Sequence, residues 1–440
     1  MTDVSMNDIS ELVRSRRASR NDAARIKARY AAENRFRAYG LTAISIALGF
    51  LAFLFYSILS QGLPAFQQTS YTLDVKFDAK EIDPDGKRDA NTLFGADYTA
   101  LARTSLQKSL GIETLDKPGQ RDLNQLLSRG IDVQLRDYVL NNPAVIGTTQ
   151  KIALLAHGNV DALLKGAIDR KIPEENRQIN DRQIGWVDHL VSKGIAAKHF
   201  NTGLFKFGAS SQPETAGLAA ALVGSFFMML IVAALSVPLG VAAALYLEEF
   251  APKNWFTDII EVNINNLAAV PSIVFGLLGL AVFINLFGLP RSAALVGGLV
   301  LTLQALPTII IATRASLRAV PPSIKEAALG VGASKMQAIF HHVLPLAVPG
   351  ILTGLIIALV HALGETAPLL MIGLVAFVVD VPSTPLEPAT ALPVQIYMWA
   401  TSAERGFVER TAGATMVLLM FLVCMNAIAV YLRHRFERRW

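Results

Sequence analysis

Residues 312–345 read ATRASLRAVPPSIKEAALGVGASKMQAIFHHVLP and lie between two long apolar runs. Within this stretch, basic residues outnumber the single acid, Glu326. The basic residues are Arg314, Arg318, Lys325 and Lys335. Because short cytoplasmic loops of membrane proteins carry an excess of Lys and Arg, the stretch is predicted to lie on the cytoplasmic side of a membrane.

Capping signals divide this stretch into two short helices joined by a glycine turn. A Ser followed three residues later by Glu or Gln is a candidate capping box, and glycines interrupt a helix. The signals are, in chain order, Ser323 with Glu326, Gly330 and Gly332, Ser334 with Gln337, and a final Pro345 that is expected to end the second helix. A compact, bent, water-facing element between two membrane spans is suited to docking on a partner protein.

The spacing of Glu326-Ala327-Ala328, Gly332 and Leu344-Pro345 resembles the EAA loop of ABC importer permeases. In that family, the resemblance implies, the loop sits in a groove of a separate ATPase subunit and transmits its movement to the membrane helices. His342 stands where the family has isoleucine, which leaves the packing of the second helix open. The alternative is that Glu326 only caps a helix in an ordinary connector. The coupling residues that the resemblance implies are Glu326, Ala327, Ala328, Gly330, Gly332, Leu344 and Pro345.

The composition is that of a protein that crosses a membrane several times. Of the 440 residues, 52% are hydrophobic, and the mean hydropathy is +0.41. The formal net charge is +5, but many basic residues lie near the chain ends, beside predicted spans. Membrane orientation and anionic lipid headgroups explain this charge better than nucleic acid does. The single cysteine, Cys424, lies in an apolar run, so no disulfide framework is available within the chain.

Six membrane spans are predicted, with both chain ends in the cytoplasm. Residues 39–60 form a run of about 22 uncharged residues, roughly 33 Å as a helix and enough to cross a bilayer. The further spans are predicted at about 215–247, 264–287, 292–313, 346–377 and 411–432. The predicted fold class is an all-α polytopic membrane protein with a small α+β domain between its first two spans.

Charge and hydropathy also divide the chain into segments. The expected segments are a basic cytoplasmic tail at 1–38 that is partly helical and partly disordered, a first transmembrane helix at 39–60, a periplasmic α+β insert at 62–213, a transmembrane domain at 214–433 that contains the coupling loop 314–345, and a cytoplasmic tail at 434–440. The insert contains no run that could span a membrane.

Patterns within the insert predict both strand and helix. Apolar residues at 71, 73, 75 and 77 alternate with polar ones, which predicts a half-buried strand, and Asp-Pro-Asp-Gly at 83–86 predicts a turn. Helical spacing is expected near Leu123 and from Ile152 to Leu164, and residues 204–207 are expected to pair back onto the strand. The histidines of the insert, His157, His189 and His199, are far apart in sequence and form no metal-ligand pattern.

The predicted third span begins with amides and a proline in apolar surroundings: Asn266, Pro271 and Ser272. Pro271 leaves a backbone carbonyl without its helical donor, which is tolerated only where neighbouring helices or water can satisfy it. This face is therefore expected inside the bundle. Lining the translocation path and ordinary helix packing explain the residues equally well.

The predicted fifth span carries His361 and Glu365, which are expected to share a helical face, and Thr366 follows them. An ionisable residue within a membrane is costly unless it faces protein or water and finds a partner. Two interpretations remain open: a place on the substrate path or gate, and structural pairing within the bundle. A carboxylate repels an anionic substrate, so Glu365 is expected to pair with a cation. Two ligands alone are a weak zinc signal, and no metal is predicted.

Several stretches resemble the phosphate permeases of ABC importers, over about residues 210–433. These are AVPSIVFGL at 269–277, LRAVP at 317–321, the EAA loop, GETAPL at 364–369 and LPVQIY at 392–397. GETAP favours the PstA type over its PstC-type partner. The resemblance implies a type I ABC importer permease bundle that carries inorganic phosphate through a bacterial inner membrane. His361 stands where family members commonly have arginine, so a fixed positive charge is not carried over to it.

No phosphate-binding P-loop motif occurs in the sequence, so we expect no ATP hydrolysis, catalytic residue or cofactor in this chain. The resemblance implies an ATPase dimer (PstB-like), a second permease (PstC-like) and a periplasmic phosphate-binding protein (PstS-like) as partners. Three alternatives remain open: a permease for another oxyanion such as sulfate, molybdate or phosphonate, a membrane sensor with an outer domain, and a secondary transporter.

Overall fold

The computed structural model describes residues 6–84, 86–375 and 377–436. Residues 1–5 of the predicted first tail and residues 437–440 of the last one lie outside the described residues. The chain forms two compact units, Met1–Ser60 and Gln61–Trp440.

The first unit consists of one long helix, α1 (Met6–Gly62), which continues just past the unit boundary. Its section from Arg25 onward is long and apolar enough to cross a membrane, as the predicted first span requires. The basic tail is helical over all of its described length, from residue 6 to residue 38, so the disorder expected there is wrong for these residues.

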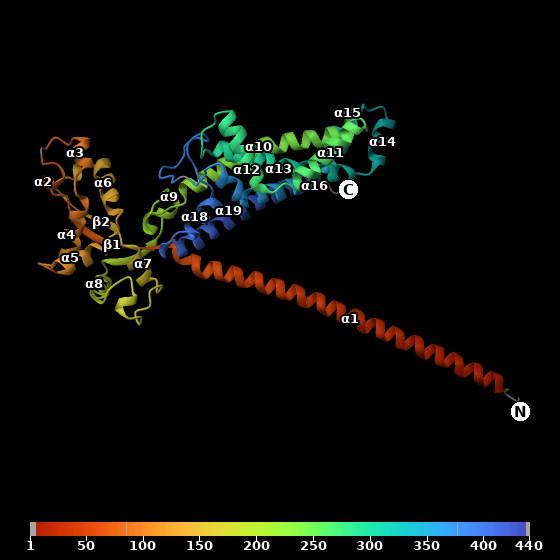
Figure 1. The fold of residues 1–440 in the computed structure, drawn as a ribbon, viewed down its shortest axis with the longest axis horizontal. Coiled ribbons are helices and arrows are strands. Elements are labelled where there is room, and N and C mark those ends of the chain that lie inside the picture. The colour runs from red at the N-terminus through yellow and green to blue at the C-terminus, as the bar shows by residue number, and fades with distance from the viewer. Residues whose placement is uncertain (1–5, 85, 376, 437–440) are drawn as a thin grey trace. The chain divides into compact units, whose positions relative to one another are not determined.

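Four further helices of the second unit are long and apolar enough to cross a membrane. They are α10 (Ala219–Leu245) with the π turn Tyr246–Phe250, α13 (Ala294–Arg318), α16 (Leu344–Gly364), which continues α15 (Lys335–Ala338) through the π turn Ile339–Val343, and α19 (Gly406–Phe436). Together with α1 they make five such helices among the described residues. In the bundle, α14 and α15 lie at one end (Figure 1).

The predicted third span is not one continuous helix. It is α11 (Trp255–Ala268) and α12 (Ser272–Gly279) with the π-helical extension Leu280–Leu286, and the two halves are bent by 102°. Pro271 lies at the break, where its ring and missing N–H stop the helix that approaches it. The six predicted spans are obtained when this bent pair counts as one crossing.

The fifth span also ends earlier than predicted. Helix α16 stops at Gly364, and Glu365 follows with extended backbone angles (φ −72°, ψ 133°). A short helix, α17 (Ala367–Met371), comes next with Pro368 in its first turn, and α18 (Leu392–Ala400) precedes the last span. Proline is well suited to starting a helix and poorly suited to continuing one. Pro368 therefore separates α17 from α16, although the apolar content of the sequence predicted one continuous span.

Glycines allow α10 and α13 to pack closely along the bundle. A Cβ placed on Gly298 would lie 2.7 Å from Cβ of Ile231, and one on Gly240 would lie 2.7 Å from a methyl group of Ile309. Neither separation is sterically possible, so a larger residue at either glycine would push the helices apart. These two helices therefore form the close-packed centre of the transport domain.

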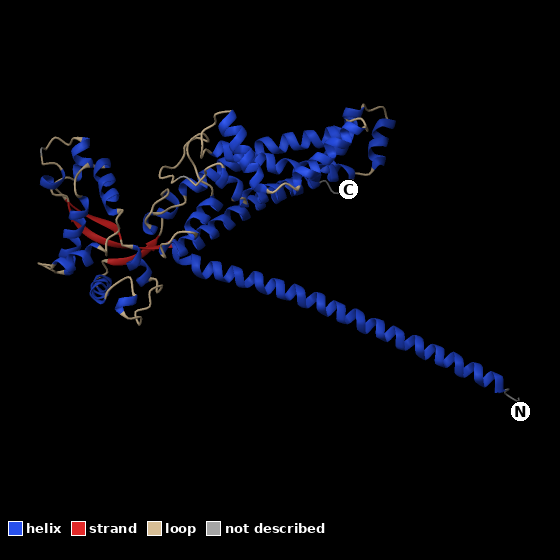
Figure 2. Ribbon diagram, viewed as in Figure 1, coloured by secondary structure: helices blue, strands red, loops and turns tan. Residues whose placement is uncertain are grey.

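The insert is an α+β domain built on an antiparallel sheet with the strand order β2-β1-β3 (Figure 2). The strands are β1 (Gln67–Lys76), β2 (Thr149–Leu155) and β3 (Ala196–Phe200). In the central strand, Leu73 is opposite Ile152 and Thr69 is opposite Lys198. The predicted alternation is confirmed, because Tyr71, Leu73, Val75 and Phe77 are all buried in one core.

The helices packed around this sheet are α2 (Ala79–Ile82), α3 (Ala90–Phe94), α4 (Tyr98–Leu110), α5 (Lys117–Asn124), α6 (Ile131–Asn141), α7 (Gly158–Leu164) and α8 (Asp181–Ser192). The short helix α9 (Gly203–Lys206) follows β3, and its Leu204 packs instead with residues of the transport domain. Two predictions are wrong here. Ile152 and Leu155 lie in a strand, because pairing with β1 overrides their helix-like spacing. Residues 204–207 do not pair with β1, whose free edge is taken by β3 instead.

The two ends of the insert meet. The backbone N–H of Asn201, after β3, donates to the carbonyl of Phe66, before β1, at 2.8 Å. The side-chain amide of Asn201 donates to the carbonyl of Ala65 at 2.9 Å, and Asn201 is 1% exposed. The chain thus enters and leaves the insert at the same place.

A group of buried charges joins the insert to the start of α19. This junction cluster consists of Asp161 on α7, Lys165 at the end of that helix, Glu214 in the turn Pro213–Thr215, and Glu409 and Arg410 on α19. The Lys165 ammonium lies 2.6 Å from carboxylate oxygens of both Asp161 and Glu409, and its side chain is only 3% exposed. Burial and the nearby Asp161 carboxylate together raise the pKa of Tyr71 above its ordinary value. The insert is therefore fixed to the transport domain through Lys165, a buried cation that pairs with acids on both sides of the junction.

Candidate functional site

The coupling loop begins with helix α14 (Pro322–Gly330), whose N-cap residue is Pro321. No side chain caps this helix, so the predicted capping box of Ser323 and Glu326 is wrong. The two prolines fix the φ angles of the first turn and start the helix one residue before Ser323, which leaves that serine inside it. The carboxylate of Glu326 is thus available for another role.

The turn after α14 has the predicted glycine geometry. Gly330 ends the helix, and Gly332 has a φ of +90°, a backbone conformation that disfavours residues with a Cβ. Helix α15 follows with the predicted capping box: the Gln337 backbone N–H donates to Ser334 Oγ at 3.3 Å, and the Ser334 backbone N–H donates to Gln337 Oε1 at 2.9 Å. The prediction of two short helices joined by a glycine turn is confirmed.

The second helix does not stop at Pro345. It continues through the π turn Ile339–Val343, which holds His342, into α16, where Leu344 and Pro345 form the first turn. Pro345 lacks the N–H that would bond to the preceding turn, and the π turn just before it alters the hydrogen-bond spacing there, so the helix continues past the proline. The coupling loop is consequently continuous with the fifth span.

The loop presents acidic and apolar side chains to the outside of the chain. Glu326 and Ala327 are exposed, whereas Ala328 is 7% exposed and packs inward. Large apolar residues around them are also exposed: Leu329, Val331, Met336 and Phe340. Val331, at the tip of the turn, is 88% exposed. Sequence reasoning missed this apolar surface, because single apolar residues in a polar loop carry no periodic signal.

The candidate path residues at the bend lie on the surface of this chain. Asn266 and Pro271 are exposed, and Ser272 is partly buried. The expectation that this face packs inside the chain's own bundle is therefore wrong. At the break the backbone N–H groups of Ala269 and Val270 donate to the carbonyls of Asn266 and Leu267, at 3.0 and 3.3 Å, so the turn satisfies these donors locally.

Glu365 is held by two side chains from different helices. Its Oε1 lies 3.1 Å from Nε2 of His361 and accepts a hydrogen bond of 2.7 Å from the side-chain amide of Gln304 on α13. The Glu365 side chain is 13% exposed, whereas that of His361 is 68% exposed. Glu365 lies just beyond the helix rather than on its face, but the predicted proximity to His361 is present. Thr366, the N-cap residue of α17, does not cap that helix with its side chain.

Gln304 was not predicted from the sequence, although a lone amide in an apolar span is itself a signal. Its nitrogen also lies 3.3 Å from His361 Nε2, while its Oε1 is buried without a hydrogen-bond partner among the described residues. The trio Gln304, His361 and Glu365 can donate and accept hydrogen bonds, and it offers one unused acceptor. No group of three or more His, Cys, Asp or Glu side chains in the described ranges could hold a metal ion.

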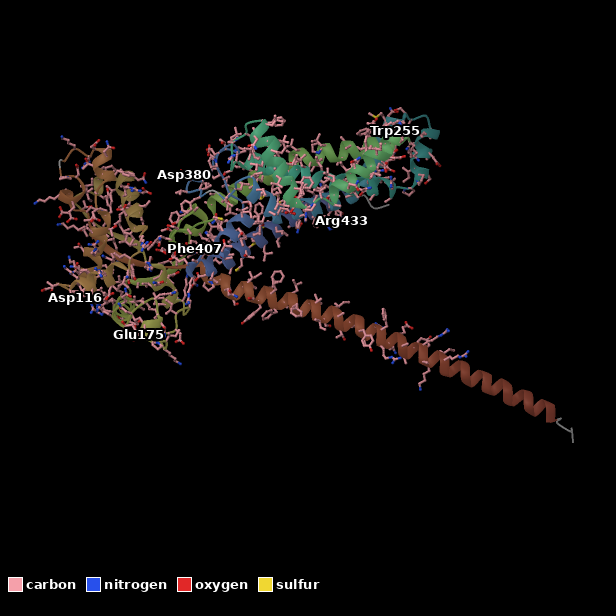
Figure 3. The ribbon with its side chains drawn as sticks, in the orientation of Figure 1. Asp116, Glu175, Trp255, Asp380, Phe407 and Arg433 are labelled. Atoms are coloured by element: carbon pink, nitrogen blue, oxygen red, sulfur yellow. The ribbon has the colours of Figure 1, made fainter. Side chains whose placement is uncertain are left out.

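The two ends of the bundle differ in what they contact. Trp255, the first residue of α11, lies at the end that carries α14 and α15, whereas Phe407, near the start of α19, lies at the insert (Figure 3). Phe407 packs with Leu204 and Trp399 in a core shared with the insert. The coupling loop and the insert thus occupy opposite ends of the transport domain.

Comparison with known families matches two parts of the chain. Residues 236–440 match the family "Binding-protein-dependent transport system inner membrane component", and residues 23–174 match a domain of unknown function (DUF3333). The second match covers part of α1 and much of the insert. Together with the relatives below, the first match identifies the chain as a multi-pass membrane component of an ABC importer, a transport subunit rather than an enzyme, that works with an ATPase and a binding protein.

Individual relatives agree with this family. The chain is 32% identical over 333 residues to the phosphate transport system permease protein PstA of Mycobacterium leprae, covering 75% of this chain and 98% of the relative. It is 31% identical over 262 residues to the probable ABC transporter permease protein YqgI of Bacillus subtilis, covering 57% of this chain and 88% of the relative. A chain of the inward-facing MetNI methionine ABC transporter aligns with a TM-score of 0.40 at 19% identity, covering 50% of this chain and 95% of that one. The chain belongs to the PstA family of phosphate transport system permeases.

Proposed function

We propose that the chain is the PstA subunit of an ATP-driven importer of inorganic phosphate in a bacterial inner membrane. It forms the translocation path with a second, PstC-like permease, and it takes its energy from a PstB-like ATPase dimer. A periplasmic PstS-like protein delivers the substrate. The observation that carries this proposal is the match to PstA of Mycobacterium leprae, which extends over 98% of that relative.

The arrangement of the helices supports an orientation for the complex. Helices α10 and α13 both run from the insert end to the coupling-loop end, and the loop carries the basic residues noted above. We therefore assign the coupling loop and both tails, 1–38 and 434–440, to the cytoplasm. The insert at 62–213 then lies in the periplasm, with the first span at 39–60 and the transport domain at 214–433.

The coupling loop is proposed to dock on the ATPase through its exposed surface. Glu326, Ala327 and Val331 face outward there, and the bent backbone at Gly332 holds the two short helices at an angle. Leu344 and Pro345 connect the loop to α16 without interruption. A push on the loop can therefore reach the fifth span as a rigid movement.

The proposed translocation path combines the bend and the Glu365 trio. Asn266, Pro271 and Ser272 supply polar groups on a surface that a second permease can cover, and Thr366 follows the trio. Because Glu365 already accepts a hydrogen bond from Gln304 and lies beside His361, it acts as a partner for donors and cations. It is not a direct ligand of an anion.

Uptake of radiolabelled phosphate tests the proposal. A strain that lacks its own PstA should regain uptake when it expresses this chain with its ATPase, and Glu326→Lys should abolish the gain. The charge reversal Glu404→Lys, at an exposed acid on the insert end, is the matched control and should leave uptake intact. Failure of the ATPase to purify with the wild-type chain would count against the proposal.

Competition identifies the anion. An excess of unlabelled phosphate should suppress uptake, whereas sulfate, molybdate and phosphonate should not. If one of these three competes better than phosphate, the chain is a permease for that oxyanion instead. Uptake that survives ATP depletion would point to a secondary transporter.

A further inference from the structure

The end of α10 departs from α-helical geometry where it meets the coupling loop. Residues Tyr246–Phe250 form a π turn, and the backbone N–H of Ala251 donates to the carbonyl of Tyr246 at 2.7 Å, five residues back. Single π turns inside helices are rare and occur frequently at functional sites. In this turn the three consecutive residues Glu248, Glu249 and Phe250 contact different parts of the molecule.

Two of these residues reach both helices of the coupling loop. The Glu249 carboxylate forms an ion pair with the ammonium of Lys325 on α14, and the Glu249 side chain is only 10% exposed. The ring of Phe250 lies under the ammonium of Lys335 on α15, 5.2 Å from the ring centroid, within range of a cation–π interaction. The turn therefore touches the loop on each side of Gly332.

The third residue reaches the neighbouring transmembrane helices. Glu248 accepts from Nε of Arg314 at 3.1 Å and from Nε of Arg318 at 2.7 Å, both on α13. Arg314 also pairs with Glu261 on α11. We call the six residues of these ion pairs the π-turn clamp: Glu248, Glu249, Glu261, Arg314, Arg318 and Lys325. Three acids face three bases, so the clamp holds no surplus charge that would drive its elements apart.

An apolar core lies beneath the clamp. Leu245, just before the π turn, is buried together with Leu317 of α13 and with Ile339 and Val343 of the second π turn. Movement of the start of α16 is therefore passed by contact to the ends of α10 and α13. The ion pairs add a second connection, from α14 to α10.

The clamp is built to rearrange rather than to lock. The side chain of Arg318 is 59% exposed, and those of Lys325 and Glu261 are 32% and 33% exposed. Pairs with access to water can exchange partners at little cost, because hydration replaces the lost contact. Arg314, which is 9% exposed, is the buried pivot between two acids on different helices.

We propose that the π turn Tyr246–Phe250 carries movement of the coupling loop to α10, and that the Glu249–Lys325 pair is the contact through which it does so. This inference rests on the proposed function as a permease driven by a separate ATPase. Through Arg314 and Glu261 the same movement reaches α11, which ends at the bend where Asn266 and Pro271 lie. Glu249 and Lys325 are positioning residues, since neither needs to touch the substrate.

The test is a charge swap in the reconstituted complex with its ATPase and binding protein. Glu249→Lys and Lys325→Glu should each lower the phosphate taken up per ATP hydrolysed by about tenfold, the size of a typical coupling between sites. The double variant Glu249→Lys/Lys325→Glu should return this ratio to within about threefold of the wild type, because the pair is restored with opposite polarity. Basal ATP hydrolysis and co-purification of the ATPase should persist in the single variant Glu249→Lys.

Lys253→Glu is the matched control, because Lys253 is exposed three residues beyond the π turn and forms no ion pair with any residue in the described ranges. It should keep the wild-type ratio. The proposal is overturned if Glu249→Lys leaves the ratio unchanged. It is also overturned if the double variant is no better than the singles, since Lys325 would then act on the ATPase directly. Absence of uptake or of an attached ATPase in the wild-type complex would instead contradict the proposed function.

Discussion

The transport domain is tied together by charges at both ends, but the junction cluster and the π-turn clamp are built differently. Lys165 in the junction cluster has a side chain that is 3% exposed, whereas Arg318 and Lys325 in the clamp are 59% and 32% exposed. A buried ion pair that loses one partner leaves a charge without compensation, whereas water compensates the charge left by an exposed ion pair. The insert is therefore held by a buried cation, whereas the bases that hold the coupling loop keep contact with water and can exchange partners.

The composition of the two clusters points the same way. The junction cluster draws on segments far apart in sequence, since Lys165 and Glu409 are 244 residues apart, and its members have little room to exchange. The clamp joins α10, α11, α13 and α14, and its bases Arg318 and Lys325 keep contact with water. Rigid attachment suits a domain that must keep its orientation, and ion pairs open to water suit an element that transmits force.

Removing the shared cation of the junction cluster should lower stability most. Lys165→Met leaves Asp161 and Glu409 without their shared cation, and should destabilise the docked insert by about 3–5 kcal/mol. Amide hydrogen exchange in β1 measures this, because the backbone N–H of Thr69 donates to Asp161 at 2.8 Å. Arg170→Met, which removes the exposed pair with Asp188, is the control and should have little effect. Equal exchange in the two variants would remove the contrast between the clusters.

Removing the charge of Arg314, the buried base of the clamp, should lower stability by less. Arg314→Met removes charged hydrogen bonds to Glu248 and Glu261, and should lower the stability of the bundle by about 2 kcal/mol. Arg318→Met, at a side chain open to water, should cost at most about 1 kcal/mol after solvent screening. Thermal unfolding of the purified chain in detergent compares the two. A larger loss for Arg318→Met would mean that the clamp has no buried pivot.

The two helices of the coupling loop differ in capping: α15 has a side-chain cap and α14 has none. Ser334→Ala removes a side-chain cap and should destabilise α15 locally by about 1 kcal/mol, whereas Ser323→Ala should change nothing because that hydroxyl caps no helix. Hydrogen exchange of the Gln337 backbone N–H, which donates to Ser334 Oγ, reports the difference. Protection that survives Ser334→Ala would show that the neighbouring π turn, not the cap, holds α15.

High salt should weaken the π-turn clamp but not the junction cluster, and this change should be the smallest of the four. At about 1 M salt the Debye length is about 3 Å, so exposed pairs are screened and buried ones are not. Amides of α14 should then exchange about twofold faster, as expected for exposed pairs of a few tenths of a kcal/mol. Amides of β1 should be unaffected. A response in β1 but not in α14 would reverse the assignment of the fixed and the movable attachment.

Local patterns in the sequence predicted local structure well. The alternation of Tyr71, Leu73, Val75 and Phe77 identified the central strand, and the Ser334–Gln337 box and Gly332 identified the second helix of the coupling loop and its turn. These succeed because each signal lies within a few residues of its effect. The first capping box failed for a related reason: the prolines at 321 and 322 start the helix more strongly than Ser323 does.

Long-range features could not be predicted. Hydropathy joined residues 264–287 and 346–377 into single spans, because apolar content does not distinguish a proline that kinks a helix from one that ends it. Gln304 meets Glu365 across 61 residues, and no spacing rule connects them. The clusters at the two ends likewise depend on which helices become neighbours, which only the packed structure determines.

The meeting of the insert's two ends at Asn201 has a consequence for the architecture of the chain. Since residues 67–200 depart from and return to one point, a short linker from Phe66 to Asn201 should allow their excision without rerouting any transmembrane helix. The path of the transmembrane helices therefore does not depend on the insert, even though ion pairs hold the insert against the transport domain in the intact protein.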